Sequence, residues 1–364
     1  MATTNNSRQR STAQRKKAKK TRNIVILVVE VLVLALMLGV LWFVTRATDE
    51  EQGIQKVEIP EEEITLNEGV EENENLEKYR TIALFGLDST VGELTKSTRS
   101  DTIMIASVNN ETKEVRLMSV YRDTYLNLGN DTYNKCNAAY AKGGPKQALN
   151  MLNMNFDLNI TDFVAVGFKG VMDAVNAVGG VYIDVDSEEL KHINNYQISI
   201  SENLKISYNP VKGTGYQLLD GLQATAYCRI RQTAGDDFKR TERQREVLSG
   251  MLERAKSMDV ASLTKMANNV FGNVYTSIDL QEILSLLSDL TSYTLVDEGG
   301  FPSSEYRAGA TIGGIGDSVI CTDLEAAVAD FHKRFFEDEA YQVSDTVKDI
   351  SKTIHTNTDA YIRH

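Results

Sequence analysis

Cysteine and histidine are scarce in this sequence, which has three cysteines and four histidines among 364 residues. The cysteines (Cys136, Cys228 and Cys321) are far apart and form no CxxC pair. Three cysteines are too few for a disulfide scaffold, and their spacing argues against a zinc site built from Cys and His. A metal ion in this protein would therefore be held by carboxylates, which favours a hard cation such as Mg²⁺.

A phosphate-binding loop of the P-loop type is also missing. None of the glycine pairs, including Gly313-Gly314, precedes the Lys-Ser/Thr that such a loop requires. Nucleotide kinase chemistry is therefore not expected.

One long hydrophobic run lies near the N-terminus. Residues 24–44 read IVILVVEVLVLALMLGVLWFV, and the residues before them carry eight Lys or Arg and no acid. A helix of this length, at ~1.5 Å per residue, matches a hydrocarbon core of ~30 Å. The run is longer than the ~7–15 residues of a signal peptide and ends in bulky side chains, so we expect an uncleaved transmembrane helix. The basic flank predicts a cytoplasmic N-terminus and an extracellular remainder in a single-pass membrane protein.

The expected organisation begins with a basic cytoplasmic tail (1–23) and the transmembrane helix (24–44). Residues 45–78 are rich in Asp and Glu and poor in large apolar groups, so we expect an acidic, solvated extracytoplasmic stalk, part of which could instead be a helix against the domain. From Tyr79 onward, apolar strands alternate with helices, and a hairpin is also expected. We predict a three-layer α/β/α sandwich over a mixed central sheet, preceded by the single transmembrane helix.

The expected strands and helices follow from periodicity and from turn residues. The expected strands are 79–87, 101–108, 114–120, 163–168, 181–185, 293–296 and 318–321. The expected helices are 145–154, 170–178, 241–256, 279–291 and 323–336.

Cations are gathered in one stretch of the otherwise acidic chain. Arg229 and Arg231 follow the apolar run 224–228, and as alternate residues of a strand they would project from one face. Arg240, Arg243 and Gln244 have the i, i+3, i+4 spacing of one helical face, near the start of a helix. A helix N-terminus with clustered arginines is a good phosphate site. A surface helix paired with neighbouring acids explains the spacing equally well.

Charged residues also stand at the ends of predicted strands. Asp88 ends the first strand, Arg99 and Asp101 lead into the second, and Arg122 and Asp123 end the third. Two carboxylates at one rim of a sheet could hold Mg²⁺ against a diphosphate. Taken singly, Asp88 and Asp101 are explained as well by capping turns.

An ordered series of motifs resembles the LytR-CpsA-Psr family over about residues 79–256. The motifs, in chain order, are Gly86-Leu87-Asp88, Arg99-Ser100-Asp101-Thr102, Ser119-Val120-Tyr121-Arg122-Asp123-Thr124, Tyr133-Asn134-Lys135-Cys136-Asn137-Ala138-Ala139-Tyr140 with Gly143-Gly144, Val178-Gly179-Gly180-Val181, Leu219-Asp220-Gly221, Tyr227-Cys228-Arg229-Ile230-Arg231, and Asp237 with Arg240, Arg243 and Gln244. The resemblance assigns 79–256 to a catalytic domain. Residues 257–364 either complete that domain or form a small appended region.

The resemblance implies an extracytoplasmic phosphotransferase. Such an enzyme moves a glycopolymer phosphate from an undecaprenyl-pyrophosphate carrier to a peptidoglycan hydroxyl, as in the attachment of teichoic acid or capsule. It also implies a role for each matching residue. Asp88 and Asp101 would bind Mg²⁺; Arg99, Arg122 and Asp123 would be catalytic; and Lys135, Arg229, Arg231, Arg240, Arg243 and Gln244 would bind the pyrophosphate. Asp123 would either orient an arginine or accept the hydroxyl proton.

Three positions depart from the family pattern, which usually has proline at Tyr121, an aliphatic residue at Cys136 and a valine-like residue at Cys228. The resemblance also implies an apolar tunnel for the lipid. Candidates to line it are Val164, Val166, Phe168, Val171, Met172, Val175 and Val178, whose spacing fits an ordinary core equally well.

Two alternatives to the transferase remain open from the sequence. The same charged site would serve a lipid-pyrophosphate hydrolase, with water in place of the sugar hydroxyl. A non-catalytic envelope regulator or transcription attenuator is the other alternative. No nucleic-acid partner is expected, because membrane topology explains the basic tail and no DNA-binding motif accompanies it.

Overall fold

The computed structural model describes residues 55–89, 94–95, 97–233, 235–258, 274–278 and 290–362. The expected cytoplasmic tail, the transmembrane helix at 24–44 and most of the expected helix at 279–291 lie outside these residues. Among the helices in the described ranges, none has both the length and the apolar character needed to cross a membrane.

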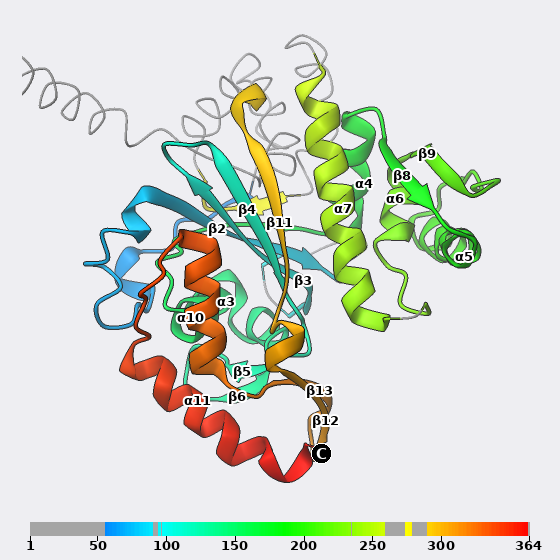
Figure 1. The fold of residues 1–364 in the computed structure, drawn as a ribbon. Coiled ribbons are helices and arrows are strands. Elements are labelled where there is room, and N and C mark those ends of the chain that lie inside the picture. The colour runs from blue at the N-terminus through cyan, green and yellow to red at the C-terminus, as the bar shows by residue number, and fades with distance from the viewer. Residues whose placement is uncertain are drawn as a thin grey trace, which may run out of the picture.

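A mixed seven-stranded sheet forms the centre of the fold (Figure 1), in the order β1-β10-β7-β2-β3-β4-β11. Its strands are β1 (Gln55–Lys56), β2 (Tyr79–Leu87), β3 (Ser100–Asn109), β4 (Glu114–Val120), β7 (Asp162–Val166), β10 (Val274–Thr276) and β11 (Thr294–Phe301). β2, β3 and β4 are antiparallel neighbours, whereas β7 runs parallel to β2 and β11 parallel to β4. The predicted mixed sheet and the predicted β3–β4 hairpin are confirmed.

The hairpin turn depends on Asn109, whose side-chain oxygen accepts hydrogen bonds from the N–H groups of Glu111 and Thr112 at 2.9 and 3.0 Å. This is a common use of asparagine in turns, and Lys113 completes the reversal with a φ of 64°. The turn aligns Met104 with Ser119 and so brings the start of β3 near the end of β4.

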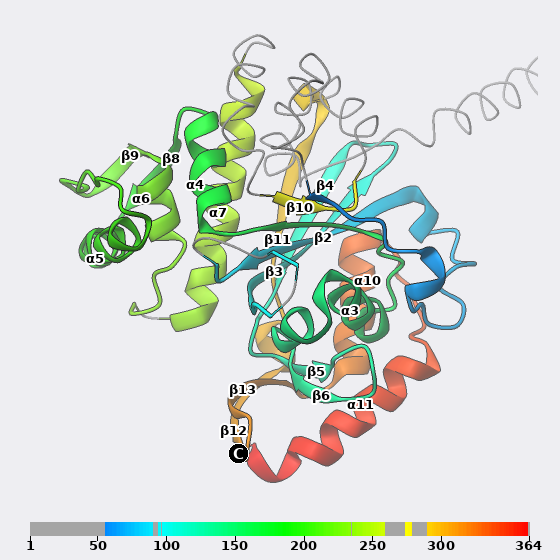
Figure 2. The same cartoon turned by 180° about the vertical axis from the view of Figure 1, so that it is seen from behind.

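Helices cover both faces of the sheet (Figures 1 and 2), and alternate residues of each strand enter separate cores. In β2, Ile82 and Leu84 belong to one core, whereas Ala83 and Phe85 belong to the other. The first core packs under α4 (Phe168–Ala177), α5 (Ser187–Leu204), α6 (Gly221–Tyr227) and α7 (Asp236–Lys256). The second packs under α3 (Ala138–Phe156), α10 (Leu324–Phe336) and α11 (Asp345–Thr358). Burial on both faces explains why β2 reads as a continuous apolar run.

In two helices, glycine and proline mark a kink or an end as predicted. α3 is kinked at Gly144, whose φ of 68° is not helical, and Pro145 begins the straight part that the sequence predicted. α4 is followed by Gly179 and Gly180, both with positive φ. The predicted strand at 181–185 also forms, as β8, but it pairs with β9 (Gly215–Leu219) in a separate two-stranded antiparallel sheet outside the central sheet, with α5 between the two strands in the chain.

The expected strand through 224–231 is wrong. Residues 221–227 form α6, which begins with a capping box in which Asp220 and Gln223 each accept a hydrogen bond from the other's backbone N–H. The small apolar residues that follow are compatible with a buried strand and with a buried helix. The capping box stabilises the first turn of the helix and so favours the helix. Arg229 and Arg231 therefore leave the turn after a helix and not one face of a strand.

Both ends of the described chain pack against the same domain. In the expected stalk, Val70 and Leu76 are buried in the second core. At the other end, β11 adds an edge strand beside β4. The hairpin of β12 (Arg307–Ile312) and β13 (Gly316–Cys321) meets the segment after β4, because Val319 N–H donates to the carbonyl oxygen of Asp123 at 2.9 Å.

Candidate active site

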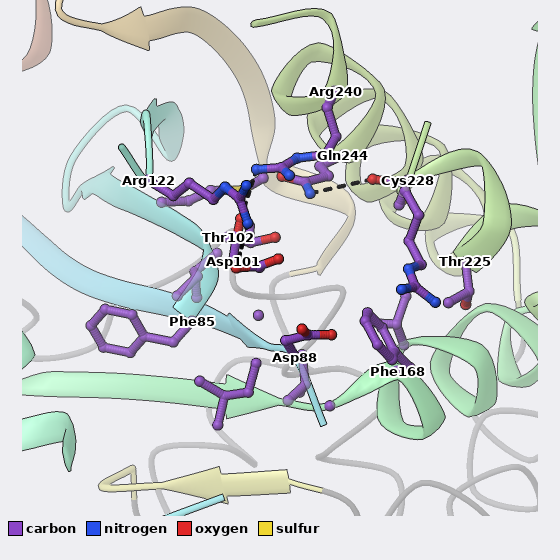
Figure 3. A pocket seen from close by; sticks show the side chains of 18 of the residues that line it. Phe85, Asp88, Asp101, Thr102, Arg122, Phe168, Thr225, Cys228, Arg240 and Gln244 are labelled. Carbon is purple, nitrogen blue, oxygen red and sulfur yellow. Dashed lines mark hydrogen bonds and ion pairs between the residues drawn. The ribbon is translucent and has the colours of Figure 1, made fainter. Parts of the chain in front are cut away.

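A pocket of about 490 Å³ opens between the first face of the sheet and helices α4, α6 and α7 (Figure 3). It contains most of the predicted site residues, namely Asp88, Arg99, Asp101, Arg122, Arg229, Arg231, Arg240 and Gln244. They arrive from the end of β2, the start of β3, the end of β4, the turn after α6 and the first turns of α7. The pocket therefore joins segments that are more than one hundred residues apart.

Asp101 is the first organising carboxylate of this site. Its Oδ1 accepts a hydrogen bond from Arg122 Nη1 at 2.7 Å, and its Oδ2 accepts one from Arg231 Nη2 at 2.9 Å. Arg240 Nη2 donates to the backbone oxygen of Asp101 at 3.2 Å. One aspartate thus holds three guanidinium groups around the mouth of the pocket.

Asp237 is the second organising carboxylate, and it was not among the predicted site residues. Its oxygens lie 3.1 Å from Arg122 Nε, 3.1 Å from Arg240 Nη1 and 3.4 Å from Arg231 Nε. Burial opposes ionisation of Asp237, but the adjacent arginines outweigh it and lower the pKa of this carboxyl. The available sequence signal was its position three residues before Arg240 in the first turn of a helix.

Arg240 is the most buried cation of the cluster, with 2% of its surface exposed. Burial lowers its pKa to about 10, and the positive charges of Arg122 and Arg231 act in the same direction against Asp237 and Asp101. Its buried Nε has no hydrogen-bond partner among the described residues. A buried, unsatisfied cationic donor suits an anionic ligand oxygen.

Asp123 and Lys135 lie behind Arg122 and outside the lining of the pocket. Lys135 Nζ is 3.2 Å from Asp123 Oδ1, and Arg122 Nε is 3.4 Å from Asp123 Oδ2. The thiol of Cys136 supports the same loop by donating to the backbone oxygens of Tyr121 and Arg122 at 3.2 and 3.3 Å. Burial raises the pKa of Cys136, so the thiol stays protonated.

Arg243 is placed away from the pocket, in the first core. It is 1% exposed, and its Nε donates to Glu189 Oε1 at 2.7 Å. On an ideal helix, i+4 lies ~40° from residue i whereas i+3 lies ~60° to the other side. Arg240 and Gln244 therefore face the pocket together, and Arg243 faces α5.

Asp88 stands across the pocket from the arginines (Figure 3). Within the described ranges, no side chain forms an ion pair or hydrogen bond with its carboxylate, and no group of three or more His, Cys, Asp or Glu could enclose a metal ion. Asp88 and Asp101 bring two carboxylates, which are hard oxygen donors, into one cavity. This donor set fits Mg²⁺, which typically uses one or two carboxylates and completes its shell with water and substrate phosphate.

The interior of the pocket is apolar. Its walls come from the sheet, from α4 and from the inner face of α7, and they are Leu84, Met104, Val166, Phe168, Val171, Val247, Leu248 and Met251. Arg229 lies at the boundary with the charged mouth, where its guanidinium is 4.4 Å from the centre of the Phe168 ring and 5.5 Å from that of Tyr196. Of the residues expected along a tunnel, Val166, Phe168 and Val171 line the pocket, whereas Val164, Met172, Val175 and Val178 belong to the first core.

A profile of the LytR-CpsA-Psr family matches residues 41–304. The chain belongs to the LytR-CpsA-Psr family. Among relatives of known name, polyisoprenyl-teichoic acid–peptidoglycan teichoic acid transferase TagV of Bacillus subtilis is 31% identical over 54% of this chain and 49% of its own length. The transferase TagU of Enterococcus faecalis is 28% identical over 76% of this chain and 85% of its own length. This chain thus spans about half of TagV and most of TagU.

Solved structures show the same LytR-CpsA-Psr fold. An Enterococcus faecalis protein described as a transcriptional regulator has a TM-score of 0.60 at 22% identity, covering 80% of this chain and 98% of that one. Bacillus subtilis TagT has a TM-score of 0.52 at 20% identity, covering 86% and 98%. At these identities the likeness establishes the fold, and the chemistry must be argued from the residues of this chain.

Proposed function

We propose that this LytR-CpsA-Psr protein transfers a teichoic-acid-type glycopolymer phosphate from a polyisoprenyl-pyrophosphate carrier to peptidoglycan. One observation carries the proposal: a single pocket joins a cluster of arginines at its mouth to an apolar interior. The mouth suits a pyrophosphate, and the interior suits the start of a polyisoprenyl chain. The names of the relatives support the same activity, since TagV and TagU are teichoic acid transferases with a polyisoprenyl-linked donor.

The proposed reaction breaks the P–O–P bond of the carrier. A peptidoglycan hydroxyl attacks the phosphorus that bears the glycopolymer, a new P–O bond forms as the P–O–P bond breaks, and the polyisoprenyl phosphate leaves with the proton that the hydroxyl loses. Negative charge spreads over the phosphoryl and leaving oxygens, where Arg122, Arg231 and Arg240 converge. These guanidiniums are held in place by Asp101 and Asp237 before substrate binds, so they need little reorganisation during the reaction.

Asp123 is proposed to orient cations. Its two oxygens lie close to Arg122 and Lys135, which supports this role over that of proton acceptor. Arg99 and Gln244 complete the mouth, and the Gln244 amide donates to the carbonyl oxygen of Cys228 at 3.4 Å.

Asp88 and Asp101 are proposed to hold Mg²⁺. When bound, the ion would neutralise part of the charge on the pyrophosphate. Asp101 would then serve both the ion and the arginines.

The protein is further proposed to be anchored in the membrane by residues 24–44, with a cytoplasmic tail before them and the enzyme outside the cell. The residues of the proposed site lie within 79–256, and the elements of residues 290–362 complete the same catalytic domain. An extracytoplasmic site would have direct access to both the lipid carrier in the membrane and the peptidoglycan.

The proposal is tested with the full chain in detergent, a lipid-pyrophosphate-linked saccharide, peptidoglycan fragments and Mg²⁺. Saccharide phosphate joined covalently to peptidoglycan, and lost in Arg122→Ala, is the expected result. Lys146→Ala is a matched control, because Lys146 is an exposed cation far from the pocket. Lipid phosphate released without a conjugate would identify a hydrolase. If the protein binds the substrate but does not turn it over, a regulatory role is favoured. A related protein of Streptococcus mutans, 31% identical over 60% of this chain, is named Biofilm regulatory protein A.

A further inference from the structure

A second cavity, of about 740 Å³, lies on the side of α7 that faces away from the active site. We call it the tyrosine groove. It is lined by the outer face of α7, by the β8–β9 pair on one side of this helix, and by β4 and β11 on its other side (Figure 1). In the part of the chain that the structure describes, no residue lines both cavities. The groove is therefore a separate feature that the proposed chemistry does not use.

Two tyrosines form one wall of the groove. The rings of Tyr182 and Tyr216 stack with their centres 5.3 Å apart and their planes 16° apart. Tyr182 is 43% exposed and Tyr216 is 74% exposed, and Leu218 beside them is 45% exposed. The outward face of a two-stranded antiparallel sheet is usually polar, so a stacked aromatic pair on β8 and β9 indicates a contact surface.

The remaining lining offers hydrogen-bonding groups. Arg254 has its guanidinium 5.7 Å from the centre of the Tyr182 ring, and its Nη2 donates to the carbonyl oxygen of Gly179 at 3.5 Å. The hydroxyl of Ser249 and the carboxylates of Glu242 and Glu253 lie along the same wall of α7. A flat aromatic surface bordered by polar groups suits a sugar ring, which has an apolar C–H face and a rim of hydroxyls.

The charge of the groove is the reverse of that at the active site. Among the described residues, four acids (Glu242, Glu246, Glu253, Asp297) and three cations (Lys239, Arg245, Arg254) line it, which gives 3 − 4 = −1. Two of these cations are already paired, Lys239 with Glu242 at 2.7 Å and Arg245 with Asp297 at 2.6 Å. Such a surface disfavours a polyphosphate chain, so the donor polymer is a poor occupant and an uncharged glycan is a better one.

The length and position of the groove suit an extended polymer. Its lining on α7 runs from Lys239 to Ser257, a rise of ~27 Å at ~1.5 Å per residue. Lys239 directly precedes Arg240 and lies in the same helical turn as Asp237. A chain lying in the groove would therefore have one end beside the arginine cluster.

We propose that the tyrosine groove binds a glycan strand of the acceptor, a polymer of N-acetylated amino sugars, and delivers its end to the active site. Its role as acceptor site rests on the proposed function, whereas glycan binding itself does not. Tyr216 is the key contact, because its ring is the most exposed and its outer face is open to a sugar.

The first arm of the test measures binding with the full chain in detergent. The probe is a hexamer of β-1,4-linked N-acetylglucosamine, and titration calorimetry gives its affinity. Tyr216→Ala is expected to weaken binding roughly tenfold, since it removes the stacking surface. Tyr216→Phe keeps the ring and should bind within about threefold of wild type. Tyr361→Ala, which removes a tyrosine of 41% exposure elsewhere on the molecule, should bind like wild type.

The second arm measures transfer. Tyr216→Ala should raise the KM for glycan acceptors about tenfold and leave the KM for the lipid-linked donor unchanged. If no transfer occurs in any variant, the proposed function fails but the calorimetric result still decides whether the groove binds glycan. Equal hexamer binding by wild type and Tyr216→Ala, or no binding by either, would overturn the proposal. So would groove-dependent binding of a sugar-free stem peptide or of poly(glycerol phosphate) in place of the hexamer.

Discussion

The Tyr121 hydroxyl accepts a hydrogen bond from Arg307 Nη1 at 3.1 Å, and this contact ties the C-terminal hairpin to the active site. The Arg307 guanidinium also lies 3.7 Å from the centre of the Phe238 ring, which meets the Tyr121 ring edge-on at 4.6 Å. Tyr121 directly precedes Arg122, and Phe238 directly follows Asp237. Arg307 therefore clamps together the two segments whose side chains form the Arg122–Asp237 ion pair.

Arg307→Ala is expected to lower kcat about tenfold while leaving the donor KM nearly unchanged, because Arg122 would lose its fixed orientation. Arg307→Lys should restore part of the activity, since an ammonium can still lie over the Phe238 ring. The direct measurement is transfer kinetics of both variants beside Tyr121→Phe, which removes only the hydroxyl. Wild-type kcat in Arg307→Ala would show that the clamp has no positioning role.

Asp237→Asn is expected to destabilise the protein at neutral pH by an amount that shrinks in acid. The pKa of Asp237 is lowered in the folded protein, so its carboxylate stabilises the fold above the ordinary Asp pKa of ~3.9. This stabilisation is lost as the pH falls through the lowered pKa, where the folded carboxylate takes up its proton. Urea unfolding of wild type and variant between pH 7 and pH 3 measures the difference. Asp349→Asn, at an exposed position on α11, is the control; a pH-independent difference for Asp237→Asn would contradict the argument.

Arg243→Ala is expected to cost about 3–5 kcal/mol in the free energy of unfolding, because Glu189 would remain buried without its partner. The double variant Arg243→Met with Glu189→Leu should be much milder, since both charges are removed together. Denaturant unfolding of the single and double variants provides the comparison. If Arg243→Ala is as stable as wild type and has lost pyrophosphate binding, Arg243 acts on substrate after all.

Val171→Trp is expected to fill the apolar interior and exclude long polyisoprenyl chains. The same variant should still accept a donor with a single short prenyl unit, because the arginine cluster at the mouth is untouched. Transfer from long-chain and short-chain donors is compared in one preparation, with thermal unfolding to confirm that overpacking costs no more than about 1–3 kcal/mol. Equal loss with both donors would point to a general disturbance of the site.

Asp88→Asn is expected to raise the Mg²⁺ concentration for half-maximal transfer by at least about tenfold, and chelation should abolish activity of the wild type. Asp123→Asn is the matched control, because Asp123 contacts Arg122 and Lys135 and does not line the pocket. Activity titrations with Mg²⁺, supported by Mn²⁺ binding measured directly, separate the two. Full activity of the wild type in chelator would remove the ion from the proposed mechanism.

Local patterns in the sequence predicted much of the sheet and several helices correctly. β2, the β3–β4 hairpin and α4 were all recognisable, because apolar period, asparagine turns and terminal glycines act over a few residues. The family resemblance also selected residues that do gather in one pocket, Asp88, Asp101 and Arg122 among them. The order of the motifs along the chain was enough to select these residues, although it gives no distances between them.

Long-range placement could not be read from the chain. The sequence determined that Arg240, Arg243 and Gln244 share a helix. Only the tertiary structure, which brings Glu189 of α5 next to Arg243, decided that Arg243 leaves the pocket. Likewise, the sequence showed that cations cluster in this stretch of the chain. It did not show that Asp237 is the residue that holds three of them. Secondary structure follows from interactions between near neighbours, but an active site joins strand ends and helix starts that meet only when the two cores close around the sheet.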